Sequence, residues 1–162
     1  MHAHRPPIAH RDIKIENILR KGEIYKLCDF GSCSVETITL TNYPTEQFYK
    51  LEELFEKNIT PMYRPPEMAD LYKRWTISTK VDIWMLGCVA YTMCYFKHPF
   101  LEGSKLAIAE ANYNFPIEKH PQNISEKMND LIRCMLTPHP DLRPDINAIC
   151  YILDNYSKLT RK

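Results

Sequence analysis

Glycine is scarce in this sequence, and a glycine-rich phosphate loop is absent from it. The 162 residues contain four glycines, and no G-x-G-x-x-G pattern can be assembled from them. Turns that let a backbone approach a nucleotide phosphate need such closely spaced glycines, because a side chain would block the approach. These residues therefore encode no nucleotide loop of that kind.

A membrane-spanning run, a signal peptide and a strong net charge are lacking as well. The most apolar stretch, residues 81–96, contains Asp82 and is shorter than the roughly 20 residues that a bilayer core needs. Residues 1–7 lack the apolar core of a secretory signal. The formal net charge is +1, so charge predicts neither nucleic-acid binding nor attachment to anionic membranes. We expect a cytoplasmic protein with no nucleic-acid partner and no transmembrane segment.

The six cysteines contain no C-x-x-C pair. Four of them fall on apolar faces of expected helices, namely Cys88, Cys94, Cys134 and Cys150. This placement favours reduced thiols in the core of a cytosolic protein over disulfide bonds. With 44% hydrophobic and 25% charged residues, the chain has the composition of one globular domain.

Two short motifs contain the groups that phosphoryl transfer needs. Residues 10–17 read H-R-D-I-K-I-E-N, and residues 29–31 read D-F-G. The first motif supplies an Asp that can take a proton, a Lys two residues later and an Asn five residues later. The second supplies another Asp before a Phe-Gly turn. Such a set can hold two metal ions and a nucleotide phosphate beside a hydroxyl.

The residues between the two motifs predict a β-hairpin. Ile18-Leu19 and residues 24–27 are apolar-rich, and a polar turn at Lys21-Gly22 separates them. Such a hairpin would place Asn17 and Asp29 at neighbouring strand ends.

The spacing H-R-D-x-K-x-x-N followed by D-F-G resembles the catalytic and metal-binding loops of eukaryotic protein kinases. The resemblance implies that Asp12 is the catalytic base that orients the substrate hydroxyl, and that Lys14 neutralises the transferred phosphoryl group. It implies that Asn17 and Asp29 bind Mg²⁺. Leu19 would form the floor of the adenine pocket, so that Lys14, Asn17, Leu19 and Asp29 together bind ATP.

The resemblance covers the large lobe of the kinase fold. The small lobe, with its glycine-rich loop, phosphate-binding Lys and partner Glu, has no counterpart in residues 1–162. The implied fold is mainly α (α+β), a partial kinase domain over residues 1–162 with a short β-hairpin region at the active site. Two alternatives stay open: a catalytically silent kinase-like interaction module, and an isolated lobe that folds poorly because it exposes apolar surface.

The polar residues from about 29 to 67 correspond to the activation segment of kinases. Thr60 opens the stretch T-P-M-Y-R-P-P-E, and a Thr at this place in kinases bonds toward the catalytic Asp and Lys and shapes the substrate platform. Such a Thr is typical of serine/threonine-specific enzymes. Arg11 would pair with a phosphate on one of the segment's hydroxyls, most of which are expected to be solvated. Residues 47–55 are predicted to form one or two helical turns.

Three charged residues match structural positions of the family. Glu67 resembles the Glu that forms a buried ion pair with the Arg of a D-x-R-P motif, here Arg143. Asp82 resembles the Asp that bonds the backbone of the catalytic loop. A carboxylate that interacts with the helix dipole is the simpler alternative for Asp82, and both roles can hold together.

Helices are predicted for most of the second half of the chain. Residues 81–96 are apolar on all sides and are expected to form the buried axis of the core, capped by Ser78 or Thr79. Three amphipathic helices are predicted to pack on it, over 104–112, from Ser125 and from Asp145.

Longer stretches narrow the resemblance to the Numb-associated kinase group. Residues 28–32, 60–72, 82–88 and 105–108 are similar to cyclin-G-associated and adaptor-associated kinases. The group carries a helix just after the activation segment, which 68–73 would begin. The resemblance implies an ATP- and Mg²⁺-dependent serine/threonine kinase. Its protein substrate would be a clathrin-adaptor subunit, and it would associate peripherally with vesicle coats.

Overall fold

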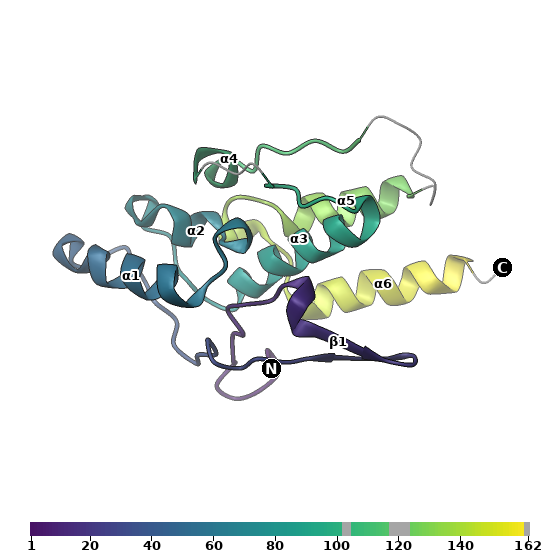
Figure 1. Ribbon diagram of the computed structural model, residues 1–162, viewed down its shortest axis with the longest axis horizontal. Coiled ribbons are helices and arrows are strands. Elements are labelled where there is room, and N and C mark those ends of the chain that lie inside the picture. Colours follow the sequence, from purple (N-terminus) through teal and green to yellow (C-terminus); the bar gives the residue numbers. More distant parts are fainter. Residues whose placement is uncertain (102–104, 117–123, 161–162) are drawn as a thin grey trace.

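The computed structural model describes residues 1–101, 105–116 and 124–160. Its helices and strands follow one another as β1 Ile18–Lys21, β2 Ile24–Leu27, α1 Phe48–Asn58, α2 Pro66–Ala69, α3 Lys80–Tyr95, α4 Lys105–Ala109, α5 Glu126–Met135 and α6 Ile146–Thr160. Figure 1 shows helices gathered around α3, with the hairpin and α4 on opposite sides of it. The predicted class, mainly α with one short hairpin, is confirmed.

The hairpin is antiparallel and pairs Ile18 with Leu27 and Lys21 with Ile24. Gly22 lies in the turn with a φ of 62°, a left-handed conformation that glycine adopts without steric cost. Beyond the strands, the Cys28 amide donates to the Asn17 carbonyl at 2.9 Å. The ladder thus extends to the ends of the two motifs, as the sequence predicts.

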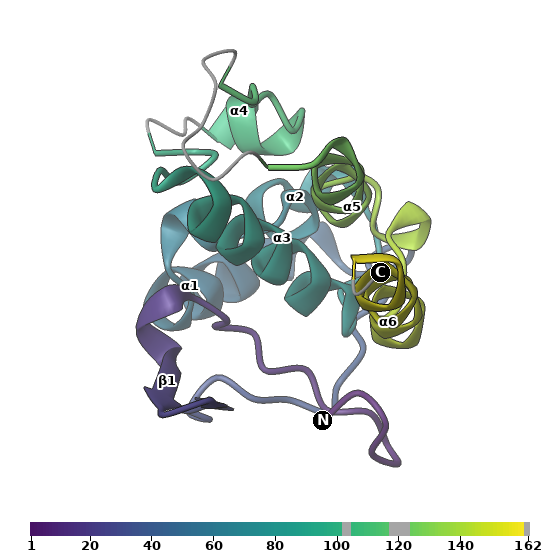
Figure 2. The same cartoon turned by 90° about the vertical axis from the view of Figure 1, so that its right-hand side faces the viewer.

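Helix α3 is the axis of the core. Trp84, Met85 and Cys88 are fully buried on it, and the end-on view in Figure 2 shows the other helices around it. Thr79 is the N-cap residue and makes no side-chain cap hydrogen bond, whereas Ser78 Oγ, one residue earlier, accepts a hydrogen bond from the Lys80 amide at 3.3 Å. None of the described helices is both long and apolar enough to cross a bilayer.

Two of the surrounding helices begin where the sequence predicts. Ser125 accepts a hydrogen bond from the Met128 amide at 3.3 Å and opens α5. Asp145 accepts one from the Ala148 amide at 2.8 Å and precedes α6. Side-chain oxygens at these positions satisfy amides that the first helical turn leaves unpaired.

Three expectations about the surrounding segments need correction. Helix α1 has 11 residues instead of one or two turns. Helix α4 ends at Ala109 and is shorter than the predicted 104–112, of which residue 104 lies outside the described residues. Cys134 and Cys150 are exposed, whereas Cys88 is buried. Both exposed thiols follow a buried apolar residue by one or two positions, and a turn of 100° per residue moves them off the packed face. All six cysteines are free thiols, as predicted.

The helix that was expected to begin within residues 68–73 is divided into two short pieces. Helix α2 covers Pro66–Ala69, and a 3₁₀ turn covers Leu71–Lys73. Asp70 lies between them and accepts a hydrogen bond from the Tyr72 amide at 3.0 Å. The carboxylate therefore begins a new turn at the point where the first helix stops.

Candidate active site

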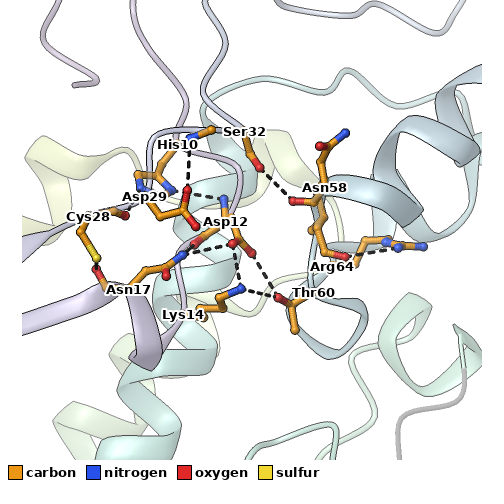
Figure 3. A network of polar contacts seen from close by, with 12 residues as sticks. His10, Asp12, Lys14, Asn17, Cys28, Asp29, Ser32, Asn58, Thr60 and Arg64 are labelled. Atoms are coloured by element: carbon orange, nitrogen blue, oxygen red, sulfur yellow. Dashed lines mark hydrogen bonds and ion pairs between the residues drawn. The ribbon is translucent and has the colours of Figure 1, made fainter.

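Asp12, Lys14 and Thr60 form a closed triangle of polar contacts (Figure 3). Lys14 Nζ lies 2.9 Å from Asp12 Oδ2 and donates to Thr60 Oγ1 at 2.9 Å. Thr60 Oγ1 in turn donates to Asp12 Oδ1 at 3.2 Å. The Thr hydroxyl accepts from the cation and donates to the anion, so its single proton is directed at the carboxylate. The sequence separates these residues by 46 and 48 positions, and the fold brings them together.

Asn17 lies on the other side of Asp12. Its Nδ2 donates to the Asp12 carbonyl at 2.9 Å and to Asp12 Oδ2 at 3.1 Å. Among the described residues no donor contacts Asn17 Oδ1. The amide is therefore held by its nitrogen, and its oxygen is the atom left for a cation.

Asp29 begins the D-F-G turn in a left-handed conformation, with a φ of 61°. Its Oδ1 accepts a hydrogen bond from the Gly31 amide at 3.3 Å, and the carboxylate is exposed. His10 contacts the D-F-G turn and the residue before it. Its ring packs against Phe30, and its Nε2 contacts the Cys28 carbonyl at 3.0 Å. The His10 Nδ1 accepts from the Asp12 amide at 3.3 Å. One imidazole thus connects the two motifs.

Asp82 of α3 holds the backbone of the H-R-D motif. Its carboxylate is 2% exposed and accepts the amides of His10 at 2.7 Å and Arg11 at 2.8 Å. Arg11 has a φ of 65°, a conformation that costs a residue with a side chain about 1 kcal/mol. The two hydrogen bonds from these backbone amides stabilise the turn at Arg11 and therefore help to orient Asp12, the next residue.

A cavity of about 480 Å³ opens beside these groups. Its lining includes Asp12, Lys14, Asp29 and Thr60, together with residues 56–59 at the end of α1. Carboxylate and amide oxygens are the protein ligands that Mg²⁺ prefers, and it binds through one or two of them while substrate phosphates complete its shell. Asn17 and Asp29 fit this pattern. The described residues contain no cluster of three or more His, Cys, Asp or Glu that could hold a metal without such help.

Leu19 lies apart from this cavity. It is 57% exposed on β1 and lines a separate hollow with Ile24 and Lys26. A single apolar side chain on an open face can contact an adenine ring from one side only. The predicted role of Leu19 therefore stays a prediction.

Glu67 and Arg143 form the buried ion pair expected from the sequence. Two parallel hydrogen bonds of 2.7 and 2.6 Å join the guanidinium and the carboxylate, and both side chains are 0% exposed. The carbonyls of Thr137, Pro138 and Lys80 accept further hydrogen bonds from Arg143 at 2.7, 2.8 and 3.0 Å. The pair joins α2 to the loop between α5 and α6.

Arg11 is buried with little compensation for its charge. Its Nη2 donates to the Glu36 carbonyl at 2.7 Å, and its Nε has no partner among the described residues. Burial lowers the pKa of the guanidinium, opposed by the charges of Glu36 and Asp82. Burial of the nearby Cys33 thiol raises its own pKa, as do the charges of Asp82 and then Asp29. Arg11, Ser32 and Ser34 all line one cavity of about 390 Å³.

Sequence reasoning missed the residues that fix helix α1 beside the site. Ser32 Oγ donates to the Asn58 carbonyl at 2.9 Å, and Arg64 Nη2 donates to the Phe55 carbonyl at 3.2 Å (Figure 3). Burial lowers the pKa of Arg64, opposed by Glu56 and then Glu52. A Ser next to D-F-G and an Arg within the T-P-M-Y-R-P-P-E stretch were visible, but their targets are backbone carbonyls, which leave no pattern in a sequence.

Arg74 fixes the other end of the same segment and was also missed. Its guanidinium donates to the carbonyls of Leu40, Thr41 and Tyr43 at 3.1, 3.3 and 3.1 Å, and to Thr45 Oγ1 at 2.7 Å. The residues before α1 thus depend on one side chain from beyond α2. The backbone of Arg74 is left-handed, with a φ of 54°.

Known proteins resemble this chain along most of its length. The family model described as "Protein kinase domain" matches residues 1–152. Actin-regulating kinase PRK1 of Saccharomyces cerevisiae is 42% identical over 163 residues, covering 100% of this chain and 19% of the relative. A probable serine/threonine-protein kinase of Dictyostelium discoideum is 40% identical over 164 residues, covering 100% of this chain and 20% of the relative. Actin-regulating kinase 1 of the same yeast is 43% identical over 148 residues, covering 90% and 22%.

Proposed function

Because the chain belongs to the protein kinase family, as the match over residues 1–152 shows, we propose that it transfers the γ-phosphate of ATP to a protein serine or threonine hydroxyl. The recognition of a protein kinase from the motifs is confirmed by the family match and the relatives. The name of the Dictyostelium relative, a probable serine/threonine-protein kinase, supports that specificity. The chain spans about a fifth of the length of the curated relatives it matches. Activity, substrate and partners of the whole protein are therefore proposals.

The triangle of Asp12, Lys14 and Thr60 carries this proposal. Asp12 Oδ1 already accepts one hydroxyl proton, that of Thr60, and an incoming substrate hydroxyl would meet the same carboxylate. Lys14 places a positive charge 2.9 Å from it, where charge accumulates on the transferred group. Phosphoryl transfer depends mostly on such positioning and electrostatic stabilisation.

Asn17 and Asp29 would hold Mg²⁺ through Oδ1 and the carboxylate. The bound metal and nucleotide supply the phosphoryl group and neutralise its charge. The protein's own part is orientation, because the Asn17 amide is fixed by Asp12 and the Asp29 carboxylate by the Gly31 amide. Residues 1–162 act as the large lobe, with an activation segment of about 29–67. In this segment Arg11 would pair with a phosphate on a hydroxyl.

Two protein substrates are supported by different observations. The Numb-associated resemblance supports a clathrin-adaptor subunit, with cytoplasmic localisation and peripheral association with vesicle coats. The names of the two yeast relatives support a protein of the actin system. Phosphorylation of a purified adaptor subunit, compared with actin-binding proteins under the same conditions, separates the two.

Replacing the proposed base tests the activity itself. In the full-length protein Asp12→Asn is expected to lower kcat by about 10²- to 10⁴-fold, the usual contribution of a general base, with the unfolding midpoint retained. Asp130→Asn changes an exposed carboxylate of α5 that pairs with Arg133 and serves as the matched control. An Asp12→Asn protein with full turnover removes Asp12 from its role. A folded wild type without transfer favours the catalytically silent interaction module.

A further inference from the structure

One hydrogen bond joins the residue after the D-F-G turn to the C-terminal end of helix α1. Ser32 donates from its Oγ to the Asn58 carbonyl at 2.9 Å (Figure 3). The contact is partly buried and spans 26 positions of the chain. Asn58 is the last residue of α1, so its carbonyl is one of those that a helix leaves without an internal partner. The Ser32 hydroxyl supplies the donor that this carbonyl lacks.

This contact lies at the boundary between two cavities. One is the cavity of about 480 Å³ beside Asp12, and the other is the cavity of about 390 Å³ beside Arg11. Four residues line both of them: Gly31, Ser32, Asn58 and Ile59. The hydrogen bond therefore belongs to the wall that separates the two cavities. If it opens, the end of α1 can move away from the D-F-G turn, and the cavity beside Asp12 loses one of its sides.

The end of α1 brings two charged side chains to the cavity beside Asp12. Glu56 and Lys57 both line this cavity, and both are exposed. A protein substrate whose hydroxyl reaches Asp12 has to pass them. Charges at a fixed position on a binding surface set the register and orientation of a partner. The position of the last turn of α1 thus determines what the substrate meets next to its phosphate acceptor.

The rest of α1 is held without Ser32. Three apolar side chains anchor the helix in the core, namely Phe48, Leu51 and Phe55. Arg64, from the segment that follows α1, donates to the Phe55 carbonyl at 3.2 Å. Loss of the Ser32 hydroxyl should therefore free the last turn and leave the helix folded. Because Ser32 lies three residues after Asp29, its contact also connects this turn with the segment that carries a proposed metal ligand.

We propose that Ser32 is a positioning residue for the protein substrate, which holds the last turn of α1 in place so that Glu56 and Lys57 face the incoming peptide. The proposal rests on the proposed kinase function for its kinetic consequence. Its structural part, the last turn of α1 held by the Ser32 hydroxyl, is independent of that function.

Removing and restoring the hydroxyl tests the kinetic role. In the full-length protein Ser32→Ala is expected to raise KM for the adaptor subunit or actin-binding protein that it phosphorylates about threefold to tenfold, the size of one neutral hydrogen bond. We expect kcat and KM for ATP to stay unchanged. Ser32→Thr keeps a hydroxyl and is expected to restore most of the loss. Wild-type kinetics in Ser32→Ala overturn the proposal, as do equal losses in both variants or a loss in kcat or in KM for ATP.

A hydroxyl in another part of the fold provides the matched control. Thr137 Oγ1 donates to the Arg133 carbonyl at 3.1 Å and so makes the same kind of contact at the end of α5. Thr137→Val removes this donor and is expected to leave KM for the protein substrate unchanged. A loss as large as that of Ser32→Ala would overturn the proposal, because the effect would then not depend on α1.

A double-mutant cycle tests whether Ser32 acts through α1. The pair of substitutions Glu56→Gln and Lys57→Gln removes both charges from the cavity and is expected to raise KM for the protein substrate. On this background Ser32→Ala is expected to add little, because the side chains that it misplaces no longer carry charge. An undiminished effect of Ser32→Ala overturns the proposal, since Ser32 would then act independently of Glu56 and Lys57.

Amide hydrogen exchange measures the position of the last turn without any activity. Ser32→Ala is expected to speed exchange at the amides of residues 56–59 and to leave the amides of α3 and α5 unchanged. Unchanged exchange at 56–59 overturns the proposal, as does faster exchange throughout the core. A wild type that phosphorylates neither protein refutes the proposed function, while exchange at 56–59 still decides whether Ser32 holds the end of α1.

Discussion

The buried arginines of this lobe differ in how their charges are compensated. Arg143 is 1% exposed and meets the carboxylate of Glu67 with two hydrogen bonds. Arg11 and Arg64 are 6% and 7% exposed, yet each donates only to backbone carbonyls and each leaves its Nε without a partner among the described residues. Burial accordingly lowers the pKa of both. The first arginine stabilises the fold through an ion pair, and the other two donate to the carbonyls of Glu36, Phe55 and Ile59.

Removing the charge of Glu67 is expected to destabilise the fold strongly. Glu67→Gln keeps the size of the side chain but leaves the Arg143 guanidinium buried beside a neutral partner. Breaking a buried pair in this way costs about 3–5 kcal/mol, and denaturant unfolding measures the loss directly.

An exposed ion pair provides the control for this prediction. Glu126 and Arg133 lie 2.7 Å apart on α5, with side chains 70% and 46% exposed. Because water screens the attraction between exposed charges, Glu126→Gln is expected to change stability little. Equal effects of the two substitutions would show that burial does not set the strength of the Glu67 pair.

At the scale of elements, helices α3 and α5 approach each other closely at Gly87. A Cβ built there would lie 2.9 Å from Leu136 Cδ2 and 3.0 Å from Met135 Cβ. Met135 Cβ is attached directly to the backbone and cannot rotate away. The glycine is thus required by packing, since its helical conformation would suit any residue.

Gly87→Ala is therefore expected to destabilise the protein. Alanine gains up to about 1 kcal/mol of helix propensity over glycine, but overpacking a core costs about 1–3 kcal/mol. We expect a net loss of about 1 kcal/mol in chemical unfolding, the middle of the difference between these two effects. Met93→Ala, at a position of α3 that is 58% exposed, is expected to stay within about 0.5 kcal/mol of the wild type. A more stable Gly87→Ala protein would mean that the helices separate at no cost.

The sequence predicts elements well where the signal is local. The hairpin follows from two apolar runs around a glycine turn, and α3 follows from an unbroken apolar stretch with Ser78 ahead of it. The length of α1 could not be predicted, because its ends are fixed by Arg64 and Arg74, which bind backbone carbonyls. The contacts of His2 with Asp82 and of Thr60 with Asp12 join residues 80 and 48 positions apart. The second was expected only through the resemblance to a family, and the first from nothing in the sequence.

On the scale of the whole molecule, the β1–β2 hairpin and the D-F-G turn leave large side chains exposed. Asp29 is exposed there, and Leu19, Tyr25 and Phe30 are 57%, 57% and 58% exposed. A nucleotide pocket normally buries most of its ligand between opposing walls. We infer that the 162 residues supply one such wall, with the proposed metal ligands Asn17 and Asp29 and the proposed base Asp12.

We expect the 162-residue chain, expressed alone, to bind Mg-ATP weakly. A single wall leaves most of the adenine and ribose in water, so the dissociation constant should be about 1 mM or weaker, near 4 kcal/mol of binding free energy. Isothermal titration calorimetry measures it, and Asp29→Ala should remove the residual metal-dependent heat. Asp130→Ala removes an exposed carboxylate on α5 and should leave this metal-dependent heat unchanged. Low-micromolar binding that Asp29→Ala abolishes would contradict this expectation, because it would show that one wall suffices to hold the nucleotide.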